Sequence, residues 1–73
     1  MPHALLVDDD RNTLAALSEL VAREGFTVAI AATLQEARQR VSERHPDVVL
    51  LDLMLPDGNG MELFDDVKSR SIT

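Results

Sequence analysis

The chain has 73 residues, of which 7 are Lys or Arg and 13 are Asp or Glu, giving a formal net charge of −6. This length allows one small domain or part of one, and the 45% hydrophobic content is typical of a chain that folds. The absence of cysteine excludes disulfide and thiolate chemistry, the acidic balance argues against nucleic acid as a partner, and no apolar run could span a membrane.

The first part of the chain predicts a strand followed by a helix. Residues 4–7 are a short apolar run that the acidic residues 8–10 stop, as expected of a strand covered on both faces. Either Asp10 or Asn12 could cap the helix that follows, and Gly25 comes after its end. The apolar stripe of this helix consists of Leu14, Leu17, Leu20 and Val21.

A second strand and helix follow. Residues 26–30 alternate between apolar and small or polar side chains, which predicts a strand. Thr33 and Glu36 have the spacing of a capping box, in which Thr33 caps the helix and Glu36 binds back to the Thr33 backbone. Pro46 ends this second helix, because the residue before a proline avoids the helical conformation.

The third unit begins with residues 48–51, the most apolar run of the chain, which predicts a buried strand ending at Asp52. Residues 56–58 form a predicted turn, and Asn59 can cap a third helix. Phe64 and Val67 share a face of that helix with Met61. Met54 and Met61 are expected to be packing residues, and His3 and His45 surface residues.

The order βαβαβα implies an α/β fold with a parallel sheet and helices as crossovers. In a flavodoxin-like winding, the strand order is 2-1-3, with the first and third strands adjacent. The first helix would cover one face of the sheet, and the second and third helices the other.

Three carboxylates follow the ends of two of these strands. Asp8 and Asp9 end the first strand and Asp52 ends the third, and open α/β sheets bind ligands beyond the carboxyl ends of their strands. Carboxylates this close hold either a proton or a cation, and hard oxygen ligands suit Mg²⁺, which would leave positions open for a phosphoryl group. Asp52 is the better candidate for a nucleophile that forms an aspartyl phosphate, and Asp8 with Asp9 for the metal-holding pair.

Two segments of the chain resemble the receiver domains of two-component response regulators. Residues 5–10, LLVDDD, are similar to the first strand and acidic pair of that family. Residues 46–60, PDVVLLDLMLPDGNG, are similar to its phospho-acceptor segment, with Pro56 and Gly60 following Asp52 at the family's spacing. The resemblance covers the whole chain and implies the CheY-like form of the flavodoxin-like fold.

The resemblance also implies a role for each residue of the acidic cluster. Asp52 corresponds to the phospho-acceptor, which receives phosphate from a sensor histidine kinase with Mg²⁺ as cofactor. Asp9 corresponds to a direct Mg²⁺ ligand, Asp8 to a residue that acts largely through water, and the backbone carbonyl of Met54 to a further ligand. Asp10 extends the pair to a triplet, and Asp8 and Asp9 are retained because they directly follow the strand.

On this resemblance the intact protein is a signalling protein rather than an enzyme, and it controls transcription through an output domain. The acceptor loop and the Asp triplet are similar to those of the NtrC-like, σ54-dependent activators. The family's domain is a (βα)₅ unit of about 120 residues. Residues 1–73 are therefore expected to be its N-terminal portion, the first three βα units, with no linker or output domain.

This truncation would remove the family's hydroxyl residue after strand four and its lysine after strand five, since the only lysine here is Lys68. Such a fragment could at most hold the metal and accept phosphate, and it should not transmit the signal in the usual way. Residues 1–3 contain no signal-peptide features, so a cytoplasmic location is expected.

A second hypothesis makes the chain a non-signalling interaction module. Strand 48–51 would be a bare apolar edge, which invites pairing with another chain, so self-association is expected. Loss of the acidic pair would leave that assembly intact, and this separates the two hypotheses.

Overall fold

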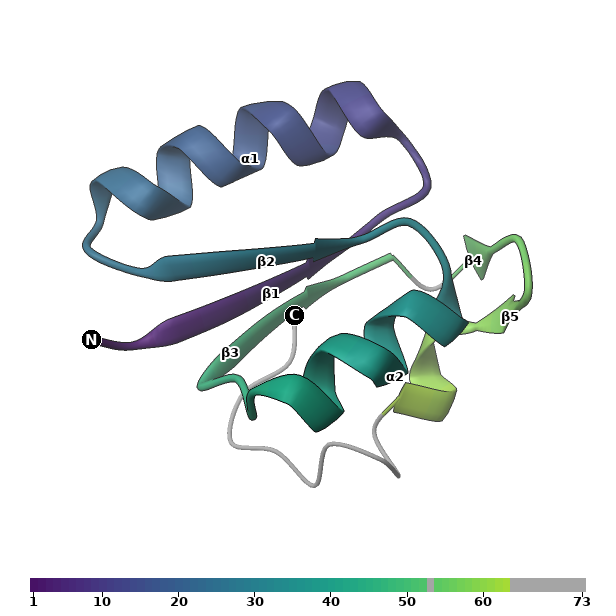
Figure 1. The fold of residues 1–73 in the computed structure, drawn as a ribbon. Helices are drawn as coiled ribbons and strands as arrows, with labels where there is room; N and C mark the ends of the chain where they lie inside the picture. Colours follow the sequence, from purple (N-terminus) through teal and green to yellow (C-terminus); the bar gives the residue numbers. More distant parts are fainter. Residues whose placement is uncertain (53, 64–73) are drawn as a thin grey trace.

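A computed structural model describes residues 1–52 and 54–63 of the chain (Figure 1). Its main sheet has three parallel strands in the order β2-β1-β3: β1 (His3–Val7), β2 (Thr27–Ala31) and β3 (Val48–Leu51). Leu5 of β1 lies opposite Ala29 on one side and Val49 on the other. The predicted α/β class, the parallel sheet and the 2-1-3 strand order are confirmed.

Two helices, α1 (Arg11–Arg23) and α2 (Leu34–Glu43), cover opposite faces of this sheet (Figure 1). The buried cluster on the α2 face consists of Leu5, Val7, Ala31, Leu34, Ala37, Val49, Leu55 and Leu63. Because side chains alternate along a strand, the buried Ala4 and Leu6 point to the other face, which α1 covers. Within the described residues, neither helix has the length and apolar content needed to cross a membrane.

The third strand, β3, is less buried than its sequence predicts. Val49 is fully buried, but Val48, Leu50 and Leu51 are only half-buried. The most enclosed strand is instead β1, every residue of which is buried. The reason is position: β1 has a partner on each side, whereas β3 pairs only with β1 among the residues that the structure describes.

The start of α1 is decided by Asp10, whose carboxylate accepts hydrogen bonds from the backbone N–H groups of Asn12 (2.9 Å) and Thr13 (3.4 Å). Of the two candidates in the sequence, Asp10 is therefore the cap. Leu20 does not belong to the buried stripe and is 57% exposed. It lies about 120° around the helix from the buried Leu14, too far to reach the sheet.

The start of α2 is capped by Thr33, as predicted, and its Oγ1 accepts a hydrogen bond from the Glu36 N–H at 3.1 Å. The reciprocal half of the predicted capping box is wrong. Glu36 Oε1 accepts from the N–H of Ala32 at 3.1 Å, one residue before the cap. The Glu36 side chain is long enough to reach past the cap residue.

A short hairpin follows β3 and was not predicted. Its strands are β4 (Met54–Leu55) and β5 (Gly58–Asn59), which pair antiparallel across the predicted turn. Strands of two residues are too short to show the alternation by which strands are recognised in a sequence. Asn59 then caps a short 3₁₀ helix, η1 (Gly60–Glu62), and the predicted continuation through residues 64–73 lies outside the described residues.

The prediction that His3 is a surface residue is wrong. His3 is 6% exposed, because it is the first residue of the central strand β1. Its Nδ1 lies 2.7 Å from Thr27 Oγ1, and its backbone N–H donates to Asp47 Oδ2 at 2.8 Å. His45 is exposed, as predicted.

Candidate functional site

The hydrogen bonds of the sheet continue one residue past β1 and β3. They place Asp8 and Asp52 together at the carboxyl ends of the strands. The N–H of Asp8 donates to the carbonyl of Ala31 at 3.0 Å, and the N–H of Asp52 donates to the carbonyl of Val7 at 2.9 Å. Asp8 and Asp52 therefore leave neighbouring strands at the same level, and Asp9 follows Asp8 on the way to α1.

The three predicted site residues form one cluster. Asp8, Asp9 and Asp52 each offer a carboxylate oxygen, and these oxygens lie within 4.8 Å of one another. Asp8 and Asp52 are half-buried, and Asp9 is exposed. Ligands on opposite sides of Mg²⁺ lie about 4.2 Å apart, twice the metal–oxygen distance, so small side-chain rotations would bring these oxygens into its coordination sphere. This all-oxygen donor set fits Mg²⁺.

Backbone N–H groups orient two of these carboxylates. Asp8 Oδ1 accepts from the N–H of Asp10 at 2.9 Å, and Asp52 Oδ1 accepts from the N–H of Met54 at 3.0 Å. Each bond engages one of the two oxygens of its carboxylate. The main chain of Met54 therefore lies beside Asp52, which is compatible with the predicted use of its carbonyl as a ligand.

Asp10 differs from Asp8 and Asp9 because it caps the start of α1. The N–H groups of Thr13 and then Asn12 hold the pKa of the Asp10 carboxyl below its ordinary value. Its carboxylate is engaged at the start of α1 and is not part of the cluster. The choice of Asp8 and Asp9 as the pair stays a prediction, and it is compatible with this arrangement.

Gly60 is in close contact with the main chain at Asp52. A Cβ at this position would overlap the carbonyl oxygen of Asp52 and would crowd Leu51. Only glycine lets the backbone approach so closely. The spacing of Gly60 after Asp52 in the sequence thus has a steric cause.

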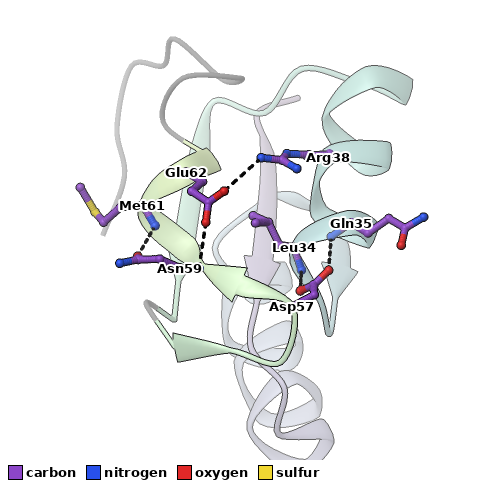
Figure 2. A network of polar contacts seen from close by, with 7 residues as sticks. All are labelled: Leu34, Gln35, Arg38, Asp57, Asn59, Met61 and Glu62. Carbon is purple, nitrogen blue, oxygen red and sulfur yellow. Dashed lines mark hydrogen bonds and ion pairs between the residues drawn. The ribbon is translucent and has the colours of Figure 1, made fainter.

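The hairpin also contacts α2, through a residue that the sequence predicts only as part of a turn (Figure 2). The Asp57 carboxylate accepts hydrogen bonds from the N–H groups of Leu34 and Gln35. These partners precede it by 23 and 22 residues, so no local pattern could have revealed the contact. Met54 and Met61 are 82% and 47% exposed, so the expectation that they are packing residues is wrong.

A groove of about 470 Å³ opens beside the cluster, between α1 and β3. Its lining combines apolar and acidic side chains, namely Val7, Asp8, Leu17, Leu50, Leu51 and Asp52. Two residues of the cluster thus face open space that solvent, a metal ion or a phosphate can enter.

Comparison with known proteins places these features in a family. Residues 4–73 match the family of response regulator receiver domains. The chain is 38% identical over 66 residues to the photosynthetic apparatus regulatory protein RegA of Rhodobacter capsulatus, covering 90% of this chain and 36% of RegA. It is 36% identical over 72 residues to the TorCAD operon transcriptional regulatory protein TorR of Escherichia coli, covering 97% of this chain and 31% of TorR.

A solved structure leads to the same family. The response regulator TrrA of Thermotoga maritima, solved in complex with Mg²⁺ and BeF, superposes with a TM-score of 0.85 at 28% identity. The match covers 97% of this chain and 66% of TrrA. The chain therefore belongs to the receiver domains of two-component response regulators, which are signalling domains. It spans about a third of the length of the curated relatives it matches.

Proposed function

We propose that this chain accepts a phosphoryl group on Asp52 and acts as a signalling domain rather than as an enzyme. The observation that carries the proposal is the convergence of Asp8, Asp9 and Asp52, whose carboxylate oxygens lie within 4.8 Å of one another. Membership of the receiver family supports the same assignment. Asp52 is the acceptor, because it stands alone at the end of β3 while Asp8 and Asp9 form a pair after β1.

In this proposal Asp8, Asp9, Asp52 and the backbone carbonyl of Met54 hold Mg²⁺. When bound, the ion offsets the negative charges of the carboxylates and of the incoming phosphoryl group. The solved complex of TrrA with Mg²⁺ and BeF supports the choice of metal. The chain itself orients the acceptor, through the 3.0 Å hydrogen bond from the Met54 N–H to Asp52 Oδ1.

The donor is the phosphohistidine of a sensor histidine kinase. A carboxylate oxygen of Asp52 forms a bond to phosphorus as the bond between phosphorus and the histidine nitrogen breaks. The histidine nitrogen then takes a proton from solvent, and Asp52 becomes an acyl phosphate. Little covalent chemistry is asked of the protein, which supplies position and charge compensation.

Residues 1–73 are then the N-terminal portion of a receiver domain, and its output is control of transcription by a domain that follows. The description of TorR as a transcriptional regulatory protein supports this output. The cytoplasmic location and the NtrC-like subgroup stay predictions from the sequence. Self-association also stays a prediction, and the comparisons favour the signalling function over the interaction module.

The test is to expose the chain to Mg²⁺ and acetyl phosphate, a small acyl phosphate donor, and to measure phosphorylation by mass spectrometry. Asp52→Asn keeps the shape of the side chain but removes the nucleophilic carboxylate, so phosphorylation should fall to background. Asp10→Asn is the matched control and should be phosphorylated like the wild type, because Asn caps a helix as well as Asp does. Undiminished phosphorylation of Asp52→Asn contradicts the proposal.

A further inference from the structure

The turn of the hairpin lies on the first turn of α2 (Figure 2). Asp57, between β4 and β5, accepts through Oδ1 from the Leu34 N–H at 2.7 Å and through Oδ2 from the Gln35 N–H at 3.0 Å. These N–H groups belong to the first two residues of the helix and have no partner within it. One carboxylate thus satisfies both.

The free N–H groups in the first turn of α2 donate to two residues, one adjacent to the helix and one distant in the sequence. Thr33 Oγ1 accepts from the third residue of the helix, Glu36, and Asp57 accepts from the first two. The hydrogen bond that Thr33 accepts joins only residues at the start of α2. The bonds to Asp57 instead fix the position of the hairpin relative to α2.

Glu62 of η1, which follows the hairpin, links the same two elements indirectly. Glu62 Oε1 lies 3.7 Å from Arg38 Nη2 of α2, and Glu62 Oε2 accepts from the Asn59 N–H at 3.1 Å (Figure 2). The ion pair is exposed and therefore weak. Leu34 belongs to the same buried cluster as Leu55 of β4. The hydrogen bonds of Asp57 are the directional part of this junction.

At its other end, the hairpin region contacts the acceptor. The N–H of Met54, the first residue of β4, donates to Asp52 Oδ1, and Gly60 lies against the Asp52 carbonyl oxygen. A shift of the hairpin relative to the sheet would therefore change the orientation of the Asp52 carboxylate. It would also move the Met54 backbone.

From these contacts we infer that Asp57 is a positioning residue for the acceptor site, which it orients by fixing the hairpin to the start of α2. The inference rests on the proposed function, because it concerns how Asp52 is held for Mg²⁺ and phosphate. The N–H groups of Leu34 and Gln35 also hold the pKa of Asp57 below its ordinary value, so the carboxylate is charged near neutral pH.

The experiment compares Asp57→Ala and Asp57→Asn with Thr33→Ala. The Thr33 substitution removes the other capping acceptor of α2, and the hydrogen bond that it removes, from the Glu36 N–H, lies within the start of the helix. Urea denaturation measures stability in each. Amide NMR shifts of Asp8, Asp9, Asp52 and Met54 during a Mg²⁺ titration measure the dissociation constant in the folded protein.

We expect Thr33→Ala to lower stability and to keep the wild-type affinity for Mg²⁺. Asp57→Ala should weaken Mg²⁺ binding by on the order of threefold to tenfold, the range that one hydrogen bond contributes to an equilibrium. Asp57→Asn keeps one acceptor oxygen and should fall between Asp57→Ala and the wild type. It also provides the comparison if Asp57→Ala does not fold.

Wild-type Mg²⁺ affinity in Asp57→Asn and Asp57→Ala would overturn the inference and leave the proposed function intact, since Asp57 would then only stabilise α2. An equal loss of affinity in Thr33→Ala would overturn it as well, because any weakening of α2 would then suffice. A wild-type chain that neither binds Mg²⁺ nor accepts phosphate would instead contradict the proposed function itself.

Discussion

Gly60 has a hydrogen atom where any other residue would place a carbon against the main chain of Asp52. Because the carbonyl oxygen belongs to the backbone, it cannot rotate away as the end of a side chain could. Gly60→Ala should therefore displace the main chain at Asp52 and destabilise the fold by about 1–3 kcal/mol, the usual cost of overpacking. It should also weaken Mg²⁺ binding. Urea denaturation measures the loss of stability, and a Mg²⁺ titration measures the loss of affinity.

Gly25 offers a matched control for that substitution. It follows α1 with φ of 91°, as predicted for a glycine after a helix, and a Cβ there would meet no atom within 4 Å. Gly25→Ala should cost about 1–2 kcal/mol through backbone strain alone and leave Mg²⁺ affinity unchanged. If Gly60→Ala keeps both wild-type stability and wild-type affinity, the close contact with Asp52 has no functional consequence.

The buried His3 should make the stability of the fold depend on pH near neutrality. Burial holds the pKa of His3 below its ordinary value, and the positive charge of Arg44 acts in the same direction, against smaller opposing effects of Asp47 and Thr27. The unfolded chain takes up the proton near pH 6.5, and the folded chain only at lower pH. Stability should therefore fall as the pH decreases through 6.5, because protons favour the unfolded state.

The measurement is urea denaturation at about pH 7.5 and about pH 5.5, on either side of the ordinary histidine pKa. The wild type should be less stable at the lower pH, and His3→Gln should show a smaller difference. The lowered pKa values of Asp10 and Asp57 start from 3.8, so these carboxyls titrate below this range. An equal loss of stability in His3→Gln would assign the effect to another group.

At the scale of the elements, the sequence predicts well those strands and helices that a local residue pattern determines. The runs 4–7 and 48–51 and the alternation over 26–30 predict the three strands of the main sheet. The stripe with Leu14 and the cap Thr33 predict α1 and α2. The rule for parallel strand ends then brings Asp8 and Asp52 together. The strands and helices depend on neighbours in the chain, and each shows a local signal, which is an apolar run, an alternation, a helical stripe or a cap.

Other features depend on neighbours in space and left no such signal. The hydrogen bonds of Asp57 join residues 23 and 22 positions apart. The burial of His3 follows from the central place of β1, and the half-burial of Leu50 from the outer place of β3. An apolar run shows that a segment can be buried, but the topology decides how deeply.

The elements also differ in how they contact the site. Main-chain hydrogen bonds of the sheet hold Asp8 to the Ala31 carbonyl of β2 and Asp52 to the Val7 carbonyl of β1. The N–H of Met54 in the hairpin donates to Asp52 Oδ1, and the hairpin is itself bonded to the start of α2 through Asp57. Catalysis by positioning needs this kind of support, since a small displacement of the reacting atoms costs much of the rate.

At the scale of the whole molecule, the chain carries a net charge of −6 and concentrates three carboxylates at one edge of its sheet. Like charges so close together repel one another, and a bound cation removes that repulsion. Mg²⁺ should therefore stabilise the folded chain as well as prepare Asp52 for phosphate, because a ligand that binds only the folded state shifts folding toward it.

The most direct test of this account is an amide-proton NMR spectrum of the chain, recorded without Mg²⁺ and then during a Mg²⁺ titration. We expect dispersed peaks and selective, saturable shifts at Asp8, Asp9, Asp52 and Met54. Dispersed peaks that do not respond to Mg²⁺, or respond equally in Asp52→Asn, would contradict the claim that these residues form one metal-binding phospho-acceptor site.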